Sequence, residues 1–499
     1  VGAFGDAARR CQAAGFDFIE IHAAHGYLIN QFFAPNSNQR TDDYGGSFEN
    51  RIRFLMELIT DIRRKCGPDY TMGIRINGED YIDNGWTLDD ALRLAVILEQ
   101  EEVAYLHVSA GVYGSKQLTI PSMYVPQGCF VDLAAAVKAR VQLPVVTVGR
   151  IKSPALADRI LQEGKADVVA LGRSLLADPQ WPNKVAAGEE SRIRPCVGCC
   201  LGCIHTVLQL EPGGCVVNPD VGREYQLGEI GNASRSRRVL VVGAGPAGLA
   251  AARMAALRGH AVTVCEQGQA AGGALALAAK PPGRADLAEL VTFFEAELAH
   301  LGVACRMNTP LDDSLLDELQ PELVILATGS LAEMPMLKGL YQARMQVCTV
   351  TEVLSGQDVA GRQVIVWGGN QAGLVLADHL ATQGKQVVVL HPKAHFGEEM
   401  SSNDRYYLRE RLTQGGVRLY KKVVVVRFEG DGVSFTADGQ PVTLAPFDTV
   451  VLADRFAPLR EAANLLRKRN LEVHFIGDAK QPRHLMYAVS EGEELAREI

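Results

Sequence analysis

The 499-residue chain has the composition of an ordinary globular protein, with 47% hydrophobic and 22% charged residues. Its 50 Lys and Arg residues against 58 Asp and Glu residues give a formal charge of −8. The mild acidity and the lack of a basic tract exclude nucleic acid and an anionic membrane surface as expected partners. The apolar content excludes intrinsic disorder, and no uninterrupted run of apolar residues is long enough to span a membrane. At about 150 residues per domain, the length predicts about three domains.

The first third of the chain alternates short apolar runs with segments of helical periodicity. The apolar runs cover residues 16–22, 71–76, 105–109, 144–149 and 166–171, and the helical segments 47–65, 88–101, 129–141 and 154–163. This alternation predicts an α/β fold with a parallel sheet, and polar loops after each run are typical of (β/α)₈ barrels. About five of the eight units of a barrel can be counted. We therefore expect residues 1–185 to form a partial TIM barrel that a further chain or segment completes.

A cysteine cluster follows in a region of little periodicity, residues 186–236. Five of the eleven cysteines fall within twenty residues, which favours a metal or cluster site in a reducing, cytoplasmic compartment over disulfides. The predicted ligands are spaced Cys196-x₂-Cys199-x₃-Cys203-x₁₁-Cys215, and Cys200 is expected not to be a ligand. Four thiolates suit either tetrahedral zinc or an iron–sulfur cluster. Structural zinc usually uses two Cys-x₂-Cys pairs, so the spacing favours iron–sulfur.

The remaining chain contains two strand–turn–helix openings that resemble each other. The first reads VLVVGAGPAG over residues 239–248, and a second strand at 261–265 leads to Glu266. Gly243, Gly245 and Gly248 allow a tight turn and the close approach of a pyrophosphate to a helix N-terminus. Glu266 is placed to accept a hydrogen bond from a ribose hydroxyl. The order of these parts predicts a dinucleotide-binding fold.

The second opening, VIVWGGNQAG over residues 364–373, keeps Gly368 and Gly373 but has Asn370 in place of the middle glycine. The strand after it, residues 386–390, leads to His391 and Lys393 and carries no acid. Two interpretations stay open here. The segment binds the 2′-phosphate of NADPH with Lys393 as the cation, or it is a dinucleotide fold that has lost its ligand.

The segments LATGS (326–330) and FIGD (475–478) are similar to elements of two-dinucleotide flavoprotein reductases. In those proteins the Gly-Asp pair contacts the flavin ribityl chain, so the resemblance implies FAD at the first opening, with Asp478 and Gly273 among its contacts. We expect a FAD-binding domain at residues 237–345 and 451–499, with an NAD(P)-binding-like domain at 346–450 inserted between the two parts.

His22, His25 and Tyr27 lie at the end of the first predicted strand. Imidazoles can hydrogen-bond a carbonyl oxygen and a phenol can deliver a proton, so these three residues are candidate catalytic groups. Their context, HAAHGYL (22–28) and SNQRTDDYGGSFENR (37–51), resembles the old yellow enzyme family. With the cysteine spacing and the two dinucleotide folds, the chain is similar to the branch that contains 2,4-dienoyl-CoA reductase, enoate reductases and trimethylamine dehydrogenase.

This resemblance implies an NAD(P)H-dependent reductase of C=C bonds conjugated to a carbonyl group, in an enone, a 2-enoate or an enoyl-CoA. Electrons would pass from NADPH or NADH to FAD, then through a [4Fe–4S] cluster to FMN. His22 and His25 would hold the substrate carbonyl oxygen, Tyr27 would donate a proton to the α-carbon, and Arg75 would lie against the flavin pyrimidine. The FMN phosphate would be held by Gly149, Arg150, Gly172 and Arg173, whose amides and guanidinium groups suit a phosphate at strand ends.

Two other functions are compatible with the same sequence. One is an amine dehydrogenase or demethylase that passes electrons through the cluster to a carrier protein, with a vestigial second nucleotide fold. The other is an electron-transfer subunit without a complete FMN site. In every case we expect a homo- or hetero-oligomer, and for the reductase a small-molecule substrate with an activated C=C bond.

Overall fold

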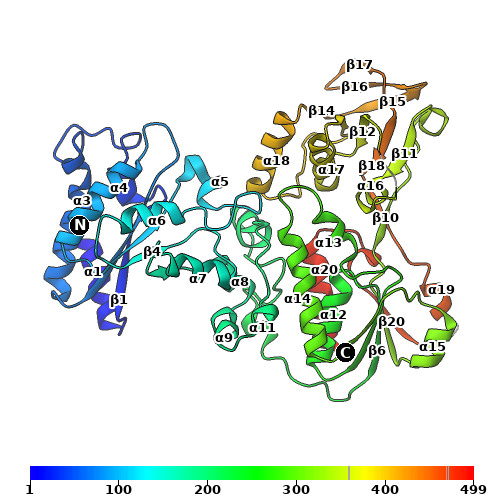
Figure 1. The fold of residues 1–499 in the computed structure, drawn as a ribbon, viewed down its shortest axis with the longest axis horizontal. Helices are drawn as coiled ribbons and strands as arrows, with labels where there is room; N and C mark the ends of the chain where they lie inside the picture. Colours follow the sequence, from blue (N-terminus) through cyan, green and yellow to red (C-terminus); the bar gives the residue numbers. More distant parts are fainter. Residues whose placement is uncertain (358–359, 468, 470) are drawn as a thin grey trace. The chain divides into compact units, whose positions relative to one another are not determined.

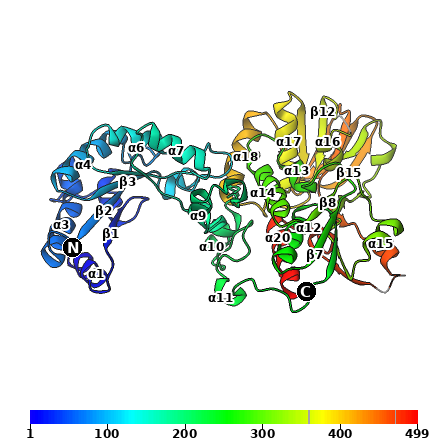
Figure 2. The ribbon, with the colours of Figure 1, turned by 60° about the horizontal axis from the view of Figure 1, so that its bottom comes forward.

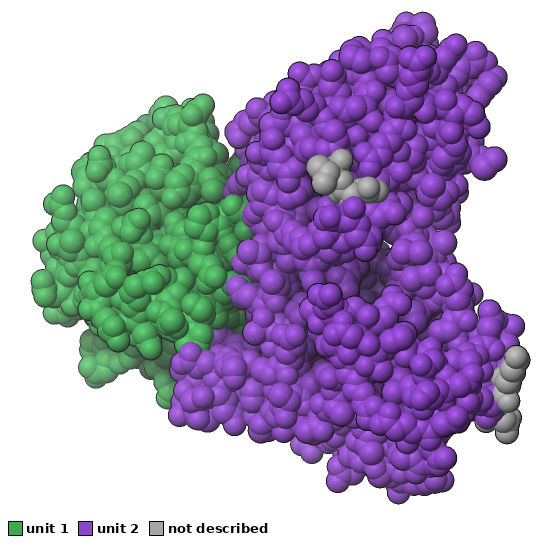
Figure 3. Space-filling view, turned by 45° about the vertical axis from the view of Figure 1, so that its right-hand side comes forward, with its two compact units in different colours: residues 1–174 green, residues 175–499 purple. Residues whose placement is uncertain are grey.

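The computed structural model describes residues 1–357, 360–467, 469 and 471–499 (Figure 1). These residues divide into two compact units, residues 1–174 and 175–499 (Figure 3). In the described part of the chain, no helix has the length and apolar character needed to cross a membrane. The α/β class predicted from the sequence is confirmed in both units.

The first unit is built on one five-stranded parallel sheet in the order β1-β2-β3-β4-β5. Its strands are β1 (Phe18–Ala23), β2 (Thr71–Asn77), β3 (Tyr105–Ser109), β4 (Val145–Thr147) and β5 (Val168–Val169). The main helices are α1 (Gly2–Ala13), α3 (Phe48–Cys66), α4 (Leu88–Gln100), α6 (Val131–Lys138) and α7 (Pro154–Gln162). The predicted five strand–helix units of an incomplete barrel are confirmed. Figure 2 shows α4, α6 and α7 following one another along the sheet.

The strands of this sheet have two chemically different faces. On β2 the side chains of Ile74 and Ile76 are fully buried in the core, whereas Arg75 and Asn77 alternate with them and point to the opposite face. The parallel register places His22 beside Arg75, and Arg75 beside His107. Polar side chains from three strands therefore share one face. At the β1 edge, Phe16 and Phe18 are 63% and 54% exposed.

The second unit contains two further five-stranded parallel sheets, and each contains one of the two glycine-rich openings. The first sheet has the order β20-β9-β6-β7-β8. Its strands are β6 (Arg238–Val242), β7 (Ala261–Cys265), β8 (Ala304–Arg306), β9 (Leu323–Leu326) and β20 (Glu472–Phe475). The helices α12 (Pro246–Leu257), α14 (Asp286–His300) and α20 (Leu485–Glu498) pack with it. Gly492 allows α20 to approach α12 closely, because a Cβ there would lie 2.4 Å from the Ala247 carbonyl oxygen.

The other sheet has the order β11-β18-β12-β13-β14. Its strands are β11 (Gln346–Thr349), β12 (Gln363–Trp367), β13 (Gln386–Leu390), β14 (Arg418–Tyr420) and β18 (Thr449–Leu452). Helices α17 (Gln371–Thr382) and α18 (Ser402–Gln414) accompany it. An antiparallel sheet of β15 (Val424–Glu429), β16 (Gly432–Ala437) and β17 (Gln440–Leu444) precedes β18.

Two short antiparallel strands lead into and out of this second sheet. They are β10 (Ser330–Ala332) and β19 (Phe456–Pro458). The chain therefore leaves the first sheet of the unit, builds the second and returns to add β20 and α20, which is the arrangement expected of an inserted domain. The expected boundary at 450/451 falls inside β18. The four-part division itself stays a prediction.

Candidate active site and cofactor-binding sites

A row of hydrogen bonds joins the carboxyl ends of β1, β2 and β3. Arg75 Nη2 donates to the Ser109 hydroxyl at 3.3 Å, and that hydroxyl lies 2.7 Å from His25 Nε2. The other ring nitrogen of His25, Nδ1, lies 3.3 Å from His22 Nε2. Three of the predicted site residues, His22, His25 and Arg75, are thereby brought together, and Ser109 is the group that connects them.

The backbone at His25 is held in an unusual conformation. His25 has a φ of 61° and Gly26 a φ of 74°, both in the left-handed region. The His25 amide donates to Asn77 Oδ1 at 3.3 Å, and the Gly26 amide donates to Asn30 Oδ1 at 2.6 Å. Two buried asparagine side chains therefore fix the turn that presents the imidazole.

Both imidazoles are uncharged near neutral pH. Burial lowers the pKa of His25 to about 3, with the charge of Arg75 acting in the same direction. Burial and Arg75 also lower the pKa of His22. A neutral imidazole carries a single N–H, so its tautomer decides what it can donate. If the Ser109 hydroxyl donates to His25 Nε2, the proton of His25 stands on Nδ1 and points toward His22.

This arrangement fits a carbonyl oxygen between the two imidazoles. An oxygen that entered there would replace the 3.3 Å contact between these nitrogens. It would accept from His25 Nδ1–H, and also from His22 once the proton of His22 stands on Nε2 instead of Nδ1. Tyr27 stands beside the pair, with its ring centroid 5.1 Å from that of His22. Two hydrogen-bond donors and a phenol are therefore gathered at one strand end.

The residues expected to hold FMN fit that group in two respects. Among the described residues, the buried Nε of Arg75 has no hydrogen-bond partner, so a flavin carbonyl oxygen or ring nitrogen would satisfy it. Arg150 Nη1 donates to the Met123 carbonyl at 3.3 Å and Arg173 Nη2 to the Pro121 carbonyl at 2.7 Å. Both guanidinium groups thus meet the same loop, next to Gly149 and Gly172. FMN binding by these residues stays a prediction.

The first glycine-rich loop has the close contacts that require glycine. A Cβ on Gly243 would lie 2.4 Å from the Ala327 carbonyl oxygen, and one on Gly248 would lie 2.0 Å from the Gly243 carbonyl oxygen. Gly245, in contrast, faces open space, with no atom within 4 Å of the same position. The N-terminus of α12 is therefore accessible to a pyrophosphate.

The other residues predicted for this site surround the same loop. The Glu266 carboxylate accepts from the Ala244 amide at 2.9 Å and from the Gly268 amide at 2.7 Å. Gly273, at the start of α13 (Gly273–Ala278), would place a Cβ 3.3 Å from Gly245 Cα. Asp478 accepts from the Ser330 hydroxyl at 2.9 Å. The preceding Gly477 would place a Cβ 2.7 Å from Ala247 Cβ, so the Gly-Asp turn lies against α12.

The second glycine-rich loop repeats this backbone with different side chains. A Cβ on Gly373 would lie 1.9 Å from the Gly368 carbonyl oxygen, as in the first loop. Where Glu266 accepts from Ala244, the buried His391 accepts on Nδ1 from the Gly369 amide at 2.9 Å. Asn370 Oδ1 accepts from the Gly373 amide at 3.0 Å. Histidine thus replaces the acid as the acceptor that closes the turn, and Lys393 remains exposed beyond it.

A carboxylate of the chain itself occupies the N-terminus of α17. Glu399 Oε1 accepts a hydrogen bond from the Gln371 amide, the place where a dinucleotide would put its pyrophosphate. A bound dinucleotide must displace this carboxylate. No local sequence pattern predicts this contact, because Glu399 follows Gln371 by 28 residues and lies in an irregular segment.

We expect Glu399→Gln to tighten the binding of NADPH about fivefold. The variant removes a negative charge that competes with the pyrophosphate for the N-terminus of α17, and such a charge is worth about 1 kcal/mol there. Quenching of protein fluorescence by NADPH measures the change. Glu398→Gln, which changes an exposed neighbour of the same charge, is the matched control. Equal affinity for both variants and the wild type would show that no dinucleotide binds against Glu399.

The cysteine segment folds around a π-helical turn, Leu201–His205. The turn packs on the irregular segment that leads to Cys215, since a Cβ on Gly202 would lie 2.8 Å from the Gly214 carbonyl oxygen. Burial raises the pKa of the Cys199 thiol well above its ordinary value, and the thiols of Cys200, Cys215 and Cys203 add to this. Sulfurs gathered in this way bind as thiolates when metal ions neutralise their charge.

Among the described residues, no set of three or more His, Cys, Asp or Glu side chains is close enough to hold a single metal ion. Cys200 is 1% exposed and its thiol is directed to the Gly198 carbonyl oxygen at 3.7 Å. The Cys200 thiol thus has a partner of its own, and an iron–sulfur cluster on the four predicted ligands stays a prediction.

We expect Cys203→Ser to lose the iron and sulfide of the purified protein, because serine cannot replace the thiolate ligand. Cys200→Ser, a control at a neighbouring buried cysteine of the same segment, is expected to retain both. Iron and sulfide per chain, with the visible absorption of the cluster, measure the outcome. Loss of iron in Cys200→Ser, or the recovery of zinc from the wild type, would contradict the assignment.

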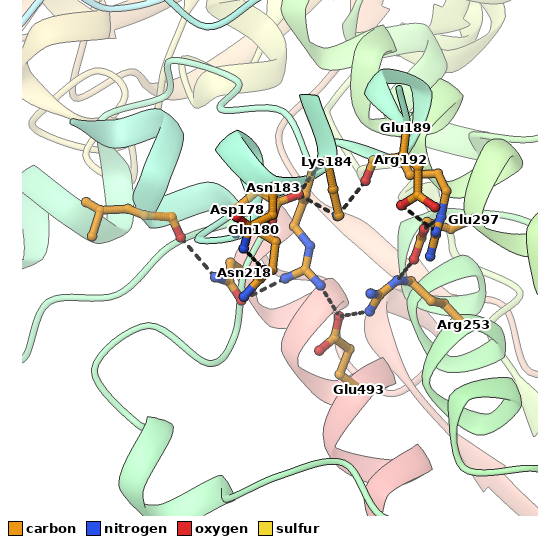
Figure 4. Close-up of polar contacts among 12 residues, drawn as sticks. Asp178, Gln180, Asn183, Lys184, Glu189, Arg192, Asn218, Arg253, Glu297 and Glu493 are labelled. Carbon is orange, nitrogen blue, oxygen red and sulfur yellow. Dashed lines mark hydrogen bonds and ion pairs between the residues drawn. The ribbon is translucent and has the colours of Figure 1, made fainter. Parts of the chain in front are cut away.

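A buried ionic network attaches the cysteine segment to the helices of the first dinucleotide sheet (Figure 4). Glu297 on α14 accepts from Arg192 Nε at 2.7 Å and from Arg253 Nε at 2.8 Å. Glu493 on α20 lies 3.5 Å from Arg194 and 3.7 Å from Arg253. Both glutamate side chains are only 2% exposed. The network continues through Arg194 Nη1, which donates to Asn218 Oδ1 at 2.7 Å, three residues after Cys215.

The two parts of the chain match two known families. Residues 1–192 match the NADH:flavin oxidoreductase / NADH oxidase family, and residues 237–474 match the pyridine nucleotide-disulphide oxidoreductases. The NADH oxidase of Thermoanaerobacter brockii is 38% identical over 500 residues, covering 99% of this chain and 77% of that protein. The chain belongs to the NADH:flavin oxidoreductase / NADH oxidase family. The resemblance found in the sequence is thereby confirmed, and the protein is an oxidoreductase with an FMN-type and a dinucleotide-binding part.

Two more members of this family are similar over the whole chain. The cinnamate reductase of Clostridium sporogenes is 31% identical over 517 residues, covering 100% of this chain and 77% of that protein. A structure of 2-naphthoyl-CoA reductase in complex with 2-naphthoyl-CoA superposes with a TM-score of 0.95 and 31% identity, covering 100% of this chain and 76% of that one. The parallel sheet of the first unit followed by dinucleotide-binding sheets is therefore an arrangement that this chain shares with that structure.

Proposed function

We propose that this protein is an NAD(P)H-dependent flavin and iron–sulfur ene-reductase that reduces a C=C bond conjugated to a carbonyl group. The observation that carries the proposal is the hydrogen-bonded row from Arg75 through Ser109 to His25 and His22. It leaves two neutral imidazoles in position to donate to one oxygen. The names of two similar proteins, a cinnamate reductase and a 2-naphthoyl-CoA reductase, agree with an unsaturated acyl substrate.

In this proposal the residues of the chain polarise the substrate and supply a proton. FMN, when bound, supplies the hydride that adds to the β-carbon. The two imidazoles stabilise the negative charge that develops on the carbonyl oxygen, and each such donor contributes about 2–4 kcal/mol. Ser109 holds His25 in the tautomer that donates toward the substrate. Tyr27 then protonates the α-carbon of the enolate.

The remaining cofactors have separate places along the chain. FAD is assigned to the loop of Gly243, Gly245 and Gly248, and the nicotinamide donor to the loop of Gly368 and Gly373. The [4Fe–4S] cluster is assigned to the four predicted cysteine ligands. Support comes from the open helix N-terminus at Gly245 and from the repeated backbone geometry of the two loops. The presence of Glu399 at the second loop requires that NADPH or NADH displace it.

The proposal is tested by two measurements on the purified protein. The first is its content of FMN, FAD, iron and sulfide per chain. The second follows the bound flavin anaerobically, first during reduction by NADPH or NADH and then during oxidation by an enone such as 2-cyclohexenone. We expect both half-reactions. Reduction of the flavin by a secondary amine without oxidation by any enone would establish the amine dehydrogenase instead, and absence of FMN would establish the electron-transfer subunit.

A further inference from the structure

Tyr113 lies next to Tyr27, on a loop that carries none of the candidate site residues described above. The loop follows β3 and contains the short helical turn η1 (Tyr113–Ser115). The Ser115 hydroxyl accepts from the Val112 amide at 2.9 Å and donates to the Asp80 carbonyl at 2.6 Å. Ser115 is only 1% exposed. A buried side chain therefore anchors the loop and fixes the position of Tyr113.

The ring of Tyr113 is seated on the turn that carries His25 and Tyr27. A Cβ on Gly26 would lie 3.3 Å from Tyr113 Cδ2 and 3.4 Å from Val112 Cβ, so the loop packs tightly against this glycine. The rings of Tyr113 and Tyr27 meet edge to face, with centroids 5.8 Å apart. The packing of the loop thus places the two phenols side by side.

The two phenols differ in their access to water. Tyr113 is 67% exposed and Tyr27 is 49% exposed, and Tyr27 is the one beside His22. The hydrogen bond to Tyr27 raises the pKa of Tyr113, with burial adding to the effect. This direction is that of a phenol that keeps its proton and donates to its neighbour. Tyr27 is therefore the phenol next to His22, and Tyr113 is the more exposed of the two.

We propose that Tyr113 is the proton relay that restores Tyr27 during enone reduction. When Tyr27 gives its proton to the α-carbon, its O–H bond breaks and a phenolate remains. The Tyr113 hydroxyl then gives its proton to that phenolate, and Tyr113 takes a proton from water. One solvent proton thereby reaches the product for each hydride, and no further reactant is needed. This inference deepens the proposed function and rests on it.

The first test compares Tyr113→Phe with the wild type in the oxidation of the bound flavin by 2-cyclohexenone. The phenylalanine keeps the ring on Gly26 and removes only the hydroxyl. We expect the oxidation to slow about 10-fold, less than the 10²–10⁴ of a direct general acid, and its solvent deuterium isotope effect to change. Reduction by NADPH should be unaffected. Tyr225→Phe, a change at a tyrosine that is 99% exposed in the other unit, is the control.

The second test does not depend on turnover. Carbon-13 NMR of ring-labelled tyrosine, with Tyr113 assigned by its absence in Tyr113→Phe, follows the titration of this phenol. In Tyr27→Phe we expect the pKa of Tyr113 to fall, because the hydrogen bond is lost. An unchanged pKa would overturn the pairing, and with it the relay.

The outcomes separate this inference from the function on which it rests. If the wild type oxidises with the enone and Tyr113→Phe does so at the same rate with the same isotope effect, the relay alone is overturned. If no enone oxidises the wild-type flavin, the proposed function is overturned and the relay falls with it.

Discussion

Replacing His25 by alanine is expected to slow the oxidation of the bound flavin by an enone about 10²–10³-fold, the usual cost of removing one oxyanion donor. The imidazole lies 3.3 Å from His22 and 2.7 Å from Ser109. Its loss therefore removes one hydrogen-bond donor to the carbonyl oxygen, and it also removes a contact that holds the second donor, His22, in place. Reduction of the flavin by NADPH should continue at the wild-type rate, because that half-reaction does not use the carbonyl site. Rapid-mixing measurements of each half-reaction separate the two effects.

Two further variants show whether His25→Ala slows the reaction because a hydrogen-bond donor is lost or because the packing of the strand end is disturbed. Ser109→Ala is expected to cost about 10-fold, since it leaves the imidazole but frees its tautomer. His300→Ala, an exposed histidine at the end of α14, should change neither half-reaction. If His25→Ala damaged both half-reactions equally, the histidine would be filling the strand end and not polarising a substrate.

Replacing Glu297 by alanine is expected to lower the free energy of unfolding by about 3–5 kcal/mol, because it leaves two arginines of a buried ion pair without their carboxylate. Glu297 is 2% exposed, and Arg253 is 12% exposed. Denaturant unfolding followed by protein fluorescence measures the loss. Because Glu297 holds the cysteine segment through Arg192, we also expect the variant to release iron faster than the wild type on dilution into a chelator.

The effect of pH distinguishes the ion pair from simple packing. Burial acts to raise the pKa of Glu297, but Arg253 and Arg192 outweigh it and the pKa is lowered. A carboxyl group with a lowered folded pKa stabilises above its unfolded pKa of about 4.3, and the stability is lost as pH falls through the folded value. The difference between wild type and Glu297→Ala should therefore be full at pH 7 and shrink below about pH 4. Glu295→Ala, which changes an exposed glutamate two residues earlier on α14, is the control. If it lowered the free energy of unfolding as much as Glu297→Ala does, the ionic network would be excluded as the cause.

Much of the fold could be predicted from local patterns. The two glycine-rich openings were recognisable because their backbone needs glycine at particular positions, as the φ values of 105° at Gly243 and 122° at Gly368 confirm. Strand–helix alternation predicted β2 and β3 to within one residue, because parallel strands in this fold are short apolar runs. The fifth strand was predicted too long, at 166–171, since only Val168–Val169 pairs with β4. The apolar character of a segment alone does not determine how many of its residues form backbone hydrogen bonds with the neighbouring strand.

The sequence by itself determined the class of this protein: which segments become strands, which loops have glycine geometry, and which side chains stand at strand ends. Only the tertiary structure decided which side chains meet. Ser109 reaches His25 from 84 residues away, and Glu297 reaches Arg192 from 105 residues away. Hydrophobic periodicity predicts which face of a helix or strand is buried, but not which element packs against that face. The protonation state of a buried carboxylate or histidine depends on the side chains of that other element. The local backbone conformation can therefore be predicted from the sequence. The tautomer of His25 and the use of His391 as the acceptor at the second glycine-rich loop depend on how distant elements pack.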